Sequence, residues 1–408
     1  MRAGGHEAKL SSGRMPAAMK RNHPLGECSV AQFMREYWQQ KPLLIRQAYP
    51  MDPAPIDWPQ VASLARRDDT DSRLISHRGD VWTLQHGPFE TLPAAKRKRW
   101  TLLLQGVDLY SDPVHTLLQD FRFLSDARLD DVMVSIASDG GGVGPHWDSY
   151  DVFLLQAQGQ RRWRIGATGY PDQLPDCLPD TALKIISQPN FSEEYLLNAG
   201  DMLYLPPGWA HDGVAIGPCT TLSIGFRAPS QAEFLQAWFT DRADRADRSR
   251  TADIRYSDAG ERPTRTPGKI PQRLDDTLKL WITESAPTST EIEDFIGRYL
   301  SEPKPDVWFE SRAGRSEMAT FKSQAVRAGL VLDRQTRMLY RRQQLFINGE
   351  RCELPANRLI RMLVNERRLT SVKAAEVLQS GLLSACLHQW WSNGWLHCNN
   401  SVQKRAAC

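Results

Sequence analysis

The chain has 408 residues, of which 41% are hydrophobic and 24% are charged, and both fractions are ordinary for a globular protein. A chain of this length usually folds into two or three domains, and no apolar stretch approaches the roughly 20 residues that a membrane-spanning helix needs. The seven cysteines are scattered and form no C-x-x-C pair. This pattern favours reduced thiols in a cytoplasmic protein and argues against a cysteine-rich metal site.

The formal net charge of +3 is unevenly distributed along the chain. Residues 1–22 contain five basic residues against Glu7, so they carry +4 and the remainder carries −1. The near-neutral remainder gives no general case for nucleic-acid binding. We expect residues 1–27 to be a basic disordered tail or the result of a start assigned too far upstream, with Met15 and Met19 as alternative starts. An organelle transit peptide is a further interpretation of this tail.

Residues 28–229 are expected to form one β-rich domain that begins with helices. The segment 31–38 is amphipathic, residues 42–45 begin a strand, and residues 113–123 predict another helix. An alternating strand follows at 131–137.

In this alternating strand, Asp131, Met133 and Ser135 share one face, and β-branched aliphatic residues share the other. An acid and a hydroxyl alternating with core residues indicate the wall of a cavity. An edge strand with one solvated face would give the same pattern.

The most informative motif is His146-Trp147-Asp148, which a glycine-rich run introduces and a later histidine, His211, completes. Residues two apart on a strand point to the same side, so His146 and Asp148 should share a face with Tyr150 and Val152. His211 follows a predicted strand and a tight turn in residues 201–210. Two imidazoles and one carboxylate can hold a ferrous ion and leave positions open for a co-substrate and dioxygen.

A basic pair comes shortly after this motif. Gly159-Gln160 predicts a hairpin turn, with residues 161–165 as the returning strand. Arg161 should then point into the barrel and Arg162 outward. A buried cation without a partner is costly, so Arg161 should meet an anionic ligand.

The second half of the chain has a different character. Residues 231–300 have a helical pattern that a Pro- and charge-rich loop at 256–271 interrupts. Short strands are expected at 329–332, 337–340 and 345–347, with Asn348-Gly349 as a hairpin turn. Helices are expected at 358–364 and 371–379, and residues 390–396 predict a terminal helix that ends in a turn and a strand.

Residues 311–345 carry a local excess of positive charge. Two acidic residues lie among eight basic ones: Arg312, Arg315, Lys322, Arg327, Arg334, Arg337, Arg341 and Arg342. A basic winged domain can contact nucleic acid. A solvated basic face is the simpler interpretation, because the sequence contains no evident base-reading helix.

Several of these stretches together resemble the bacterial JmjC-type ribosomal oxygenases of the cupin superfamily, and in particular those that hydroxylate an arginine. The resemblance extends over most of residues 28–400. It is carried by Ser135, by the run from Gly140 to Phe153, by Gly159–Trp163, by Leu205–His211 and by Gly225–Pro229, with weaker support from Asp71–His77, His86–Glu90 and Tyr256–Asp258.

The resemblance implies an α+β fold: a double-stranded β-helix, that is, a JmjC/cupin jelly roll, over 28–229, a helical dimerisation region over 230–302 and a winged-helix-like domain over 303–408. It further implies that His146, Asp148 and His211 bind Fe(II). Arg161 and Ser135 would bind 2-oxoglutarate, and O2 would be the second co-substrate.

The substrate that the resemblance implies is an arginine side chain, hydroxylated at C3, in a large-subunit ribosomal protein of the L-sixteen family. Asp131 would then pair with its guanidinium, while Met133 and Tyr150 would flank its aliphatic stem. A homodimer is implied as well.

Three other functions remain open at this point. The chain could hydroxylate a histidine of another ribosomal protein or demethylate lysine. It could be a cupin that uses a different metal on a small ligand, or a non-catalytic, dimeric, ribosome-associated module.

Overall fold

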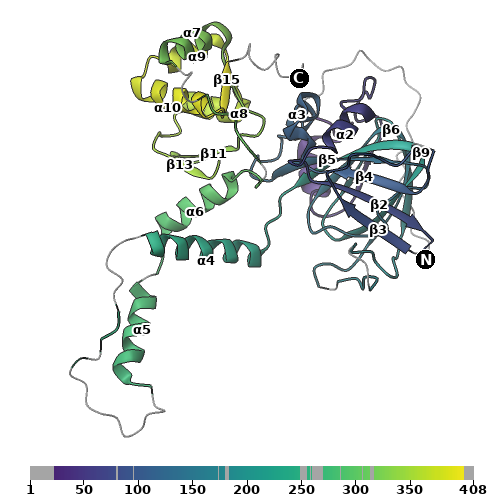
Figure 1. Ribbon diagram of the computed structural model, residues 1–408, viewed down its shortest axis with the longest axis horizontal. Coiled ribbons are helices and arrows are strands. Elements are labelled where there is room, and N and C mark those ends of the chain that lie inside the picture. Colours follow the sequence, from purple (N-terminus) through teal and green to yellow (C-terminus); the bar gives the residue numbers. More distant parts are fainter. Residues whose placement is uncertain are drawn as a thin grey trace. The chain divides into compact units, whose positions relative to one another are not determined.

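The structure of the chain is a computed structural model, which describes residues 23–79, 81–94, 96–172, 174–179, 183–248, 255–257, 259, 270–284, 286–305, 307–312 and 317–398. It divides into two compact units, one up to Phe226 and one from Arg227 onward (Figure 1). Residues 1–22 of the expected tail lie outside the described residues. Residues 23–27 are described, and Leu25 is buried in the core of the first unit, so this part of the expected tail is packed rather than free.

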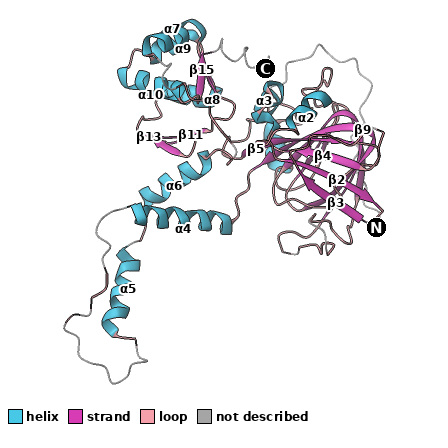
Figure 2. Ribbon diagram, in the orientation of Figure 1, coloured by secondary structure: helices cyan, strands magenta, loops and turns pink. Residues whose placement is uncertain are grey.

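The first unit contains short helices whose starts follow from their sequences. These are α1 (Val30–Glu36), α2 (Trp58–Leu64), η1 (Val107–Leu109) and α3 (Asp112–Gln119). Ser29, Asp57 and Ser111 each accept a backbone N–H from the first turn of α1, α2 and α3, respectively. Such caps satisfy amide groups that have no partner within the helix. Figure 2 shows α2 and α3 beside the strands of the barrel.

The remainder of the first unit is a nine-stranded antiparallel sheet with the order β1-β8-β6-β9-β5-β4-β2-β3, and β7 also pairs with β6. The strands are β1 (Leu43–Ile45), β2 (Ser72–Arg78), β3 (Val81–His86), β4 (Trp100–Leu104), β5 (Leu129–Ala137), β6 (Val152–Ala167), β7 (Glu193–Asn198), β8 (Met202–Leu205) and β9 (Trp209–Phe226). They form the double-stranded β-helix that the sequence predicts. The core lies between the sheet and the N-terminal helices, where Phe33, Phe121 and Phe153 pack together.

The predicted hairpin at Gly159-Gln160 is wrong. β6 runs without reversal from Val152 to Ala167 and pairs with β9 on both sides of Gly159. Gly159 has a left-handed φ of 66°, and the pairing register shifts between residues 156 and 160. The glycine therefore marks irregular pairing within a continuous strand rather than a turn between two strands. Arg161 is nevertheless buried and Arg162 exposed, as the alternation predicted.

The segment from His146 to Tyr150 also differs from the expectation, because it is not part of a regular strand. His146 forms an isolated bridge with His211, and β6 begins only at Val152. The motif therefore lacks the regular alternation of a strand, and the backbone bridge between His146 and His211 holds it beside β9 instead.

The second unit combines helices with a small winged fold. Its helices are α4 (Gln231–Arg248), α5 (Gln272–Glu284), α6 (Ser289–Ser301), α7 (Met318–Ala328), α8 (Arg358–Glu366), α9 (Ser371–Val377) and α10 (Gly381–Ser392). Its strands are β10 (Leu330–Leu332), β11 (Met338–Arg341), β12 (Gln344–Ile347), β13 (Glu350–Cys352), β14 (Arg368–Leu369) and β15 (Leu396–Cys398). Asn348 and Gly349 both have positive φ and form the β12–β13 hairpin turn, as predicted.

The second unit has a core of its own, centred on Phe321, Leu345, Ile360 and Trp390. Close packing also involves α6, since a side chain at Gly297 would collide with the ring of Phe346 on β12. Among the described residues, no helix combines the length and the apolar character that crossing a membrane requires.

We predict that Gly159→Ala destabilises the first unit more than Gly217→Ala. Both glycines have a left-handed φ, so each substitution should cost about 1–2 kcal/mol of backbone strain. A Cβ at Gly159 would lie 2.3 Å from the carbonyl oxygen of Pro218, whereas a Cβ at Gly217 meets nothing within 4 Å. The collision should add roughly 1–3 kcal/mol to the loss, measured as the free energy of unfolding in urea. Equal losses would show that the irregular pairing does not depend on this close approach.

Candidate active site

The two histidines of the motif are held together by their own backbones. The amide of His146 donates to the carbonyl of His211 at 3.0 Å, and the amide of His211 donates back to His146 at 2.7 Å. Their ring centroids lie 4.2 Å apart. The turn before β9 adds a third link, because the amide of Gly208 donates to the carbonyl of Asp148 at 2.8 Å. Residues 60 or more positions apart in the sequence are thus brought into one compact cluster.

Hydrogen bonds to the backbone set the tautomer of both rings. Nδ1 of His146 lies 2.9 Å from the carbonyl oxygen of Gly144, and Nδ1 of His211 lies 2.9 Å from that of Trp209. A carbonyl oxygen only accepts, so each Nδ1 carries the proton and each Nε2 presents a lone pair. This arrangement is typical of histidines that bind a metal.

Asp148 completes the set of potential ligands. One of its carboxylate oxygens lies 3.6 Å from Nε2 of His211, and one ligand atom each from His146, Asp148 and His211 lies within 4.8 Å of the others. Burial and the neighbouring ring of His146 lower the pKa of His211 to about 4. The imidazole is therefore neutral at neutral pH, which is the form that binds a metal. The trio can hold a divalent ion on one face and leave other positions open.

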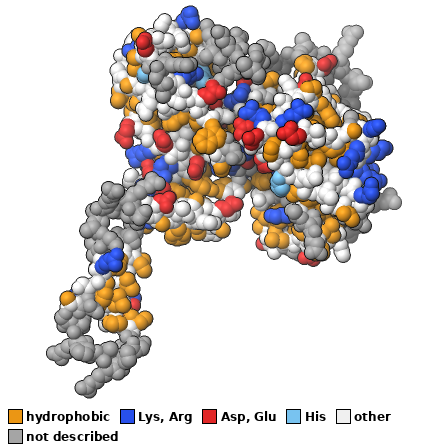
Figure 3. Space-filling model, in the orientation of Figure 1, with side chains coloured by type: hydrophobic (Ala, Val, Ile, Leu, Met, Phe, Trp, Pro, Cys, Tyr) orange, Lys and Arg blue, Asp and Glu red, His pale blue; other side chains and the backbone are white. Residues whose placement is uncertain are grey.

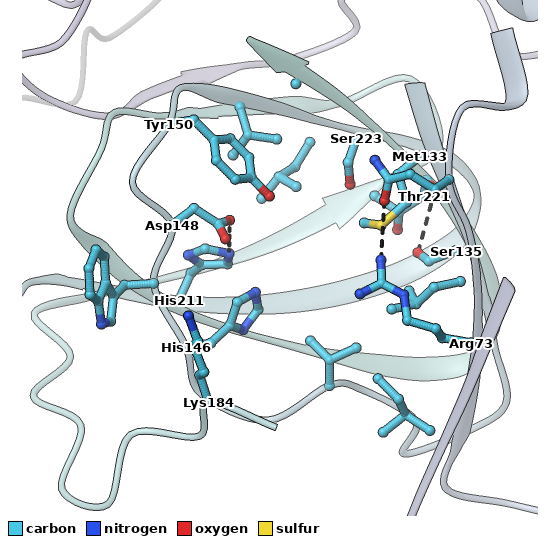
Figure 4. Close-up of a pocket in the computed structure, with 18 of the residues that line it drawn as sticks. Arg73, Met133, Ser135, His146, Asp148, Tyr150, Lys184, His211, Thr221 and Ser223 are labelled. Atoms are coloured by element: carbon cyan, nitrogen blue, oxygen red, sulfur yellow. Dashed lines mark hydrogen bonds and ion pairs between the residues drawn. The ribbon is translucent and has the colours of Figure 1, made fainter. Parts of the chain in front are cut away.

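All eight site residues predicted from the sequence line one cavity of about 260 Å³. They are His146, Asp148, His211, Arg161, Ser135, Asp131, Met133 and Tyr150. In Figure 4 the potential ligands and Tyr150 lie on one side of the cavity, while Met133 and Ser135 lie on another. The predicted alternation of β5 therefore matches the structure, because Asp131, Met133 and Ser135 all face inward.

Arg161 is a buried cation that has no carboxylate partner among the described residues. Its side chain is 3% exposed, its Nη2 donates to the thiol sulfur of Cys219 at 3.6 Å, and its Nε has no hydrogen-bond partner. Its guanidinium also lies 5.7 Å from the ring centroid of Trp163. A buried charge in this state is costly until it meets an anion, so the cavity is suited to a carboxylate ligand at this position.

Ser135 lines the same cavity as Arg161. It is buried, and its hydroxyl donates to the carbonyl oxygen of Thr221 at 3.4 Å, which is a long hydrogen bond. A hydroxyl held this weakly can turn toward a ligand at little cost.

A second part of the cavity is acidic. Asp131 is 2% exposed, and Tyr150 keeps 41% of its surface exposed. Burial of the phenol and the neighbouring carboxylates of Asp148, Asp131 and Asp130 raise the pKa of Tyr150, which also hydrogen-bonds Asp148. The phenol therefore stays protonated, and this part of the cavity is suited to a cation.

Sequence reasoning missed several residues that line the cavity. Arg73 on β2 and Gln105 just after β4 are among them, as are Trp163 and Lys184. Figure 4 places Arg73 near Met133 and Ser135, and Lys184 beside His146. Arg73 and Ile75 both line the cavity, so the period of two along β2 was an available signal. Gln105 and Lys184 lie outside regular strands and carried no comparable signal.

Part of the basic segment in the second unit is engaged in internal contacts. Arg312 donates to the carbonyl oxygen of Trp391 at 2.5 Å and to Nδ1 of His397 at 2.7 Å. Arg341 forms an ion pair with Glu293 at 2.5 Å. Some of the positive charge of this segment therefore has partners within the protein, and a nucleic-acid ligand is not needed to explain it.

Two family models match the chain. A JmjC domain matches residues 116–234, and a ROXA-like winged helix matches residues 279–397. The first includes every potential metal ligand, and the second covers most of the second unit.

Individual similar proteins and solved structures indicate the same family. The ribosomal protein uL16 3-hydroxylase of Escherichia coli (strain K12) is 31% identical over 369 residues, which are 89% of this chain and 96% of the relative. A probable ribosomal oxygenase of Haemophilus influenzae is 34% identical over 210 residues, half of each chain. The X-ray structure of E. coli ycfD superposes with a TM-score of 0.78 at 28% identity, covering 90% of this chain and 98% of the other. A YcfD complex with cobalt and 2-oxoglutarate superposes with a TM-score of 0.75 at 27% identity, covering 90% and 97%.

We predict that His146→Ala and Asp148→Ala each abolish turnover of 2-oxoglutarate while the protein stays folded. Each substitution removes one of three ligand atoms, and the backbone pair between residues 146 and 211 is retained because it involves no side chain. Succinate formation and titration of the apoprotein with Fe(II) or Mn(II) would measure the loss, with circular dichroism as the folding control. Full turnover by either variant in added iron would contradict the assignment of these ligands.

Proposed function

Since the chain belongs to the JmjC-domain ribosomal oxygenases, we propose that it hydroxylates an arginine side chain at C3 in a ribosomal protein of the uL16 family. The observation that carries this proposal is the combination within one cavity of a two-histidine, one-carboxylate cluster with the buried cation of Arg161, which has no carboxylate partner in the part of the chain that the structure describes. The first feature suits Fe(II), and the second suits a dicarboxylate co-substrate.

The donor set supports iron rather than a softer metal. His146, Asp148 and His211 offer two imidazole nitrogens and one carboxylate, with no thiolate. When bound there, Fe(II) supplies the activation of O2 that couples oxidative decarboxylation of 2-oxoglutarate to hydroxylation of a C–H bond. The protein has to hold the ligands, place both substrates and keep water out.

Arg161 is proposed to bind the far carboxylate of 2-oxoglutarate, and Ser135 to donate a hydrogen bond to the same molecule. Guanidinium and carboxylate groups match in geometry and charge, so this contact would orient the co-substrate as well as hold it. The stacked indole of Trp163 limits the positions that the Arg161 side chain can take.

The arginine of the substrate is proposed to enter the acidic part of the cavity. Asp131 would pair with its guanidinium, and Met133 and Tyr150 would flank its aliphatic stem. The protonated phenol of Tyr150 can donate to an acceptor without adding negative charge of its own.

We further assign residues 28–229 to the catalytic domain, 230–302 to a dimerisation region and 303–408 to a winged-helix-like domain. Support for a homodimer comes from α5, on which Leu278, Leu280 and Ile282 are exposed, and Figure 3 shows hydrophobic side chains along this helix. Exposed apolar groups on one helix favour a self-complementary interface. We place the enzyme in the cytoplasm, where a ribosomal substrate would be available and the cysteine thiols among the described residues would stay reduced.

Mass spectrometry of ribosomal proteins tests the function. We expect one large-subunit protein from a deletion strain to be 16 Da lighter than in the parent, with the difference on an arginine. The purified enzyme with Fe(II), 2-oxoglutarate and O2 should restore the mass. A change on histidine, or none, would refute the proposed substrate.

We predict that Arg161→Ala raises the KM for 2-oxoglutarate far more than Arg162→Ala does. The two residues are neighbours of the same type, but only Arg161 is buried in the cavity wall. Removing a buried partner of a charge typically costs about 3–5 kcal/mol, so the loss should exceed a hundredfold. Initial rates over a range of 2-oxoglutarate concentrations measure the effect. If the two variants behaved alike, the co-substrate would bind elsewhere.

We predict that Asp131→Asn weakens hydroxylation of an arginine-containing ribosomal peptide but leaves peptide-independent decarboxylation of 2-oxoglutarate nearly intact. Asparagine keeps the shape of the side chain and removes the charge that would face the guanidinium. The measurement is the rate of peptide hydroxylation set against succinate formed without peptide. Wild-type hydroxylation by this variant, or a preference for a histidine peptide, would contradict the arginine pocket.

We predict that Ile282→Glu converts a dimer into a monomer and that Val372→Glu does not. Both residues are highly exposed, at 74% and 72%, but Ile282 lies on α5 and Val372 on α9. Light scattering after size-exclusion chromatography, at several protein concentrations, gives the mass. A monomeric wild type would remove the dimer from the proposal.

A further inference from the structure

Gln105 connects a cation and a carboxylate in the wall of the cavity. Its Nε2 lies 3.0 Å from Oδ1 and 2.7 Å from Oδ2 of Asp131, while its Oε1 lies 3.2 Å from Nη2 of Arg73. All three residues line the cavity. None of these contacts belongs to the metal cluster or to the co-substrate residues Arg161 and Ser135.

The orientation of the Gln105 amide follows from its two partners. A guanidinium can only donate hydrogen bonds, so the side of the amide that faces Arg73 must be the oxygen. The NH2 group is thereby directed at Asp131, where an ionised carboxylate can only accept. The opposite orientation would set donor against donor and acceptor against acceptor. Arg73 therefore determines which end of Gln105 the carboxylate meets.

The backbone holds this arrangement in place. Arg73 is opposite Leu103 in the β2–β4 ladder, and the amide of Gln105 donates to the carbonyl of Asp71 at 2.9 Å. The carboxylate of Asp71 lies 3.9 Å from Nε of Arg73, an atom that has no hydrogen-bond partner. Asp131 is on β5, two strands from β2 in the sheet. Gln105, which directly follows β4, thus bridges a side chain of β2 and a side chain of β5.

We propose that Gln105, oriented by Arg73, positions the carboxylate of Asp131 to receive a planar guanidinium and thereby sets the preference for arginine over lysine. A carboxylate has about four lone-pair sites, so it can accept from the amide of Gln105 and from a ligand as well. Paired hydrogen bonds to a guanidinium need a carboxylate in a defined plane, whereas an ammonium is a point charge with much weaker demands. This inference rests on the proposed function, in which Asp131 binds the arginine of the substrate.

Gln105→Leu and Arg73→Met test the two positions separately. Each keeps most of the side-chain volume and removes the polar contacts. Gln160→Leu and Arg162→Met are matched controls, because both residues lie on β6 and neither lines the cavity, and the Gln160 side chain donates to Asn198 instead. Thermal unfolding of all four variants verifies that they fold.

For Gln105→Leu we expect the KM for an arginine peptide to rise about tenfold, since a hydrogen bond to a charged group is lost. Arg73→Met should have a smaller effect in the same direction. In both variants the KM for 2-oxoglutarate and the peptide-independent rate should stay within about twofold of wild type. The controls should match wild type in every respect.

The readout specific to positioning is the ratio of affinities for an arginine peptide and the same peptide with lysine. Gln105→Leu should reduce this ratio by lowering the affinity for arginine more than that for lysine. A purely structural role would weaken both alike. A lower KM for the arginine peptide would also overturn the proposal, since Gln105 would then compete with the substrate for Asp131.

Two further outcomes separate this inference from the proposed function. If Asp131→Asn loses peptide hydroxylation but Gln105→Leu and Arg73→Met behave like wild type, the positioning role fails and the arginine pocket stands. If Asp131→Asn hydroxylates the arginine peptide normally, the proposed pocket fails and the positioning role fails with it. A raised KM for 2-oxoglutarate in Arg73→Met would assign Arg73 to the co-substrate instead.

Discussion

The antiparallel pairing of β6 with β9 is the constraint on which the site depends. Along this ladder Arg161 is opposite Ala215, Trp163 is opposite Gly213, and Ile165 is opposite His211. Facing residues in an antiparallel pair share a side of the sheet, so one register places the buried cation and a metal ligand on the same wall. Gly213 leaves room for the indole of Trp163, which lies near both the guanidinium of Arg161 and the imidazole of His211.

A buried acid anchors the segment that leads into β6. Asp151, at the entrance to β6, accepts from the hydroxyl of Tyr204 at 2.6 Å, from Gln39 at 3.0 Å and from Arg128 at 3.2 Å. Burial raises its pKa, and these three partners oppose the shift. Because Asp151 directly follows Tyr150, this cluster holds the end of the metal motif in the core while the backbone pair of His146 holds its beginning. The irregular segment between them needs no strand pairing of its own.

Sequence reasoning succeeded where one local rule decides the outcome. Alternation along a strand placed Arg161 inside and Arg162 outside, and Asn348-Gly349 adopted the positive φ values of a tight hairpin turn. It failed at Gly159, because a left-handed glycine is equally compatible with a hairpin turn and with irregular pairing inside a strand. Only pairing with β9 on both sides distinguishes the two. The contact between Gln105 and Asp131 spans 26 residues and depends on the order of the strands, which no local pattern contains.

The charges of the cavity explain how one small space could serve two substrates of opposite charge. A dicarboxylate is attracted to Arg161 and repelled by the carboxylates near Tyr150, whereas a guanidinium is attracted to those carboxylates and repelled by Arg161. Arg73 would disturb this division if it faced Asp131 directly, because an ion pair between them would offset the negative charge that we propose binds the substrate. With the amide of Gln105 between the two, each charge has a neutral partner of the correct polarity. The acidic part of the cavity can therefore keep its negative potential although a cation lies in the same wall.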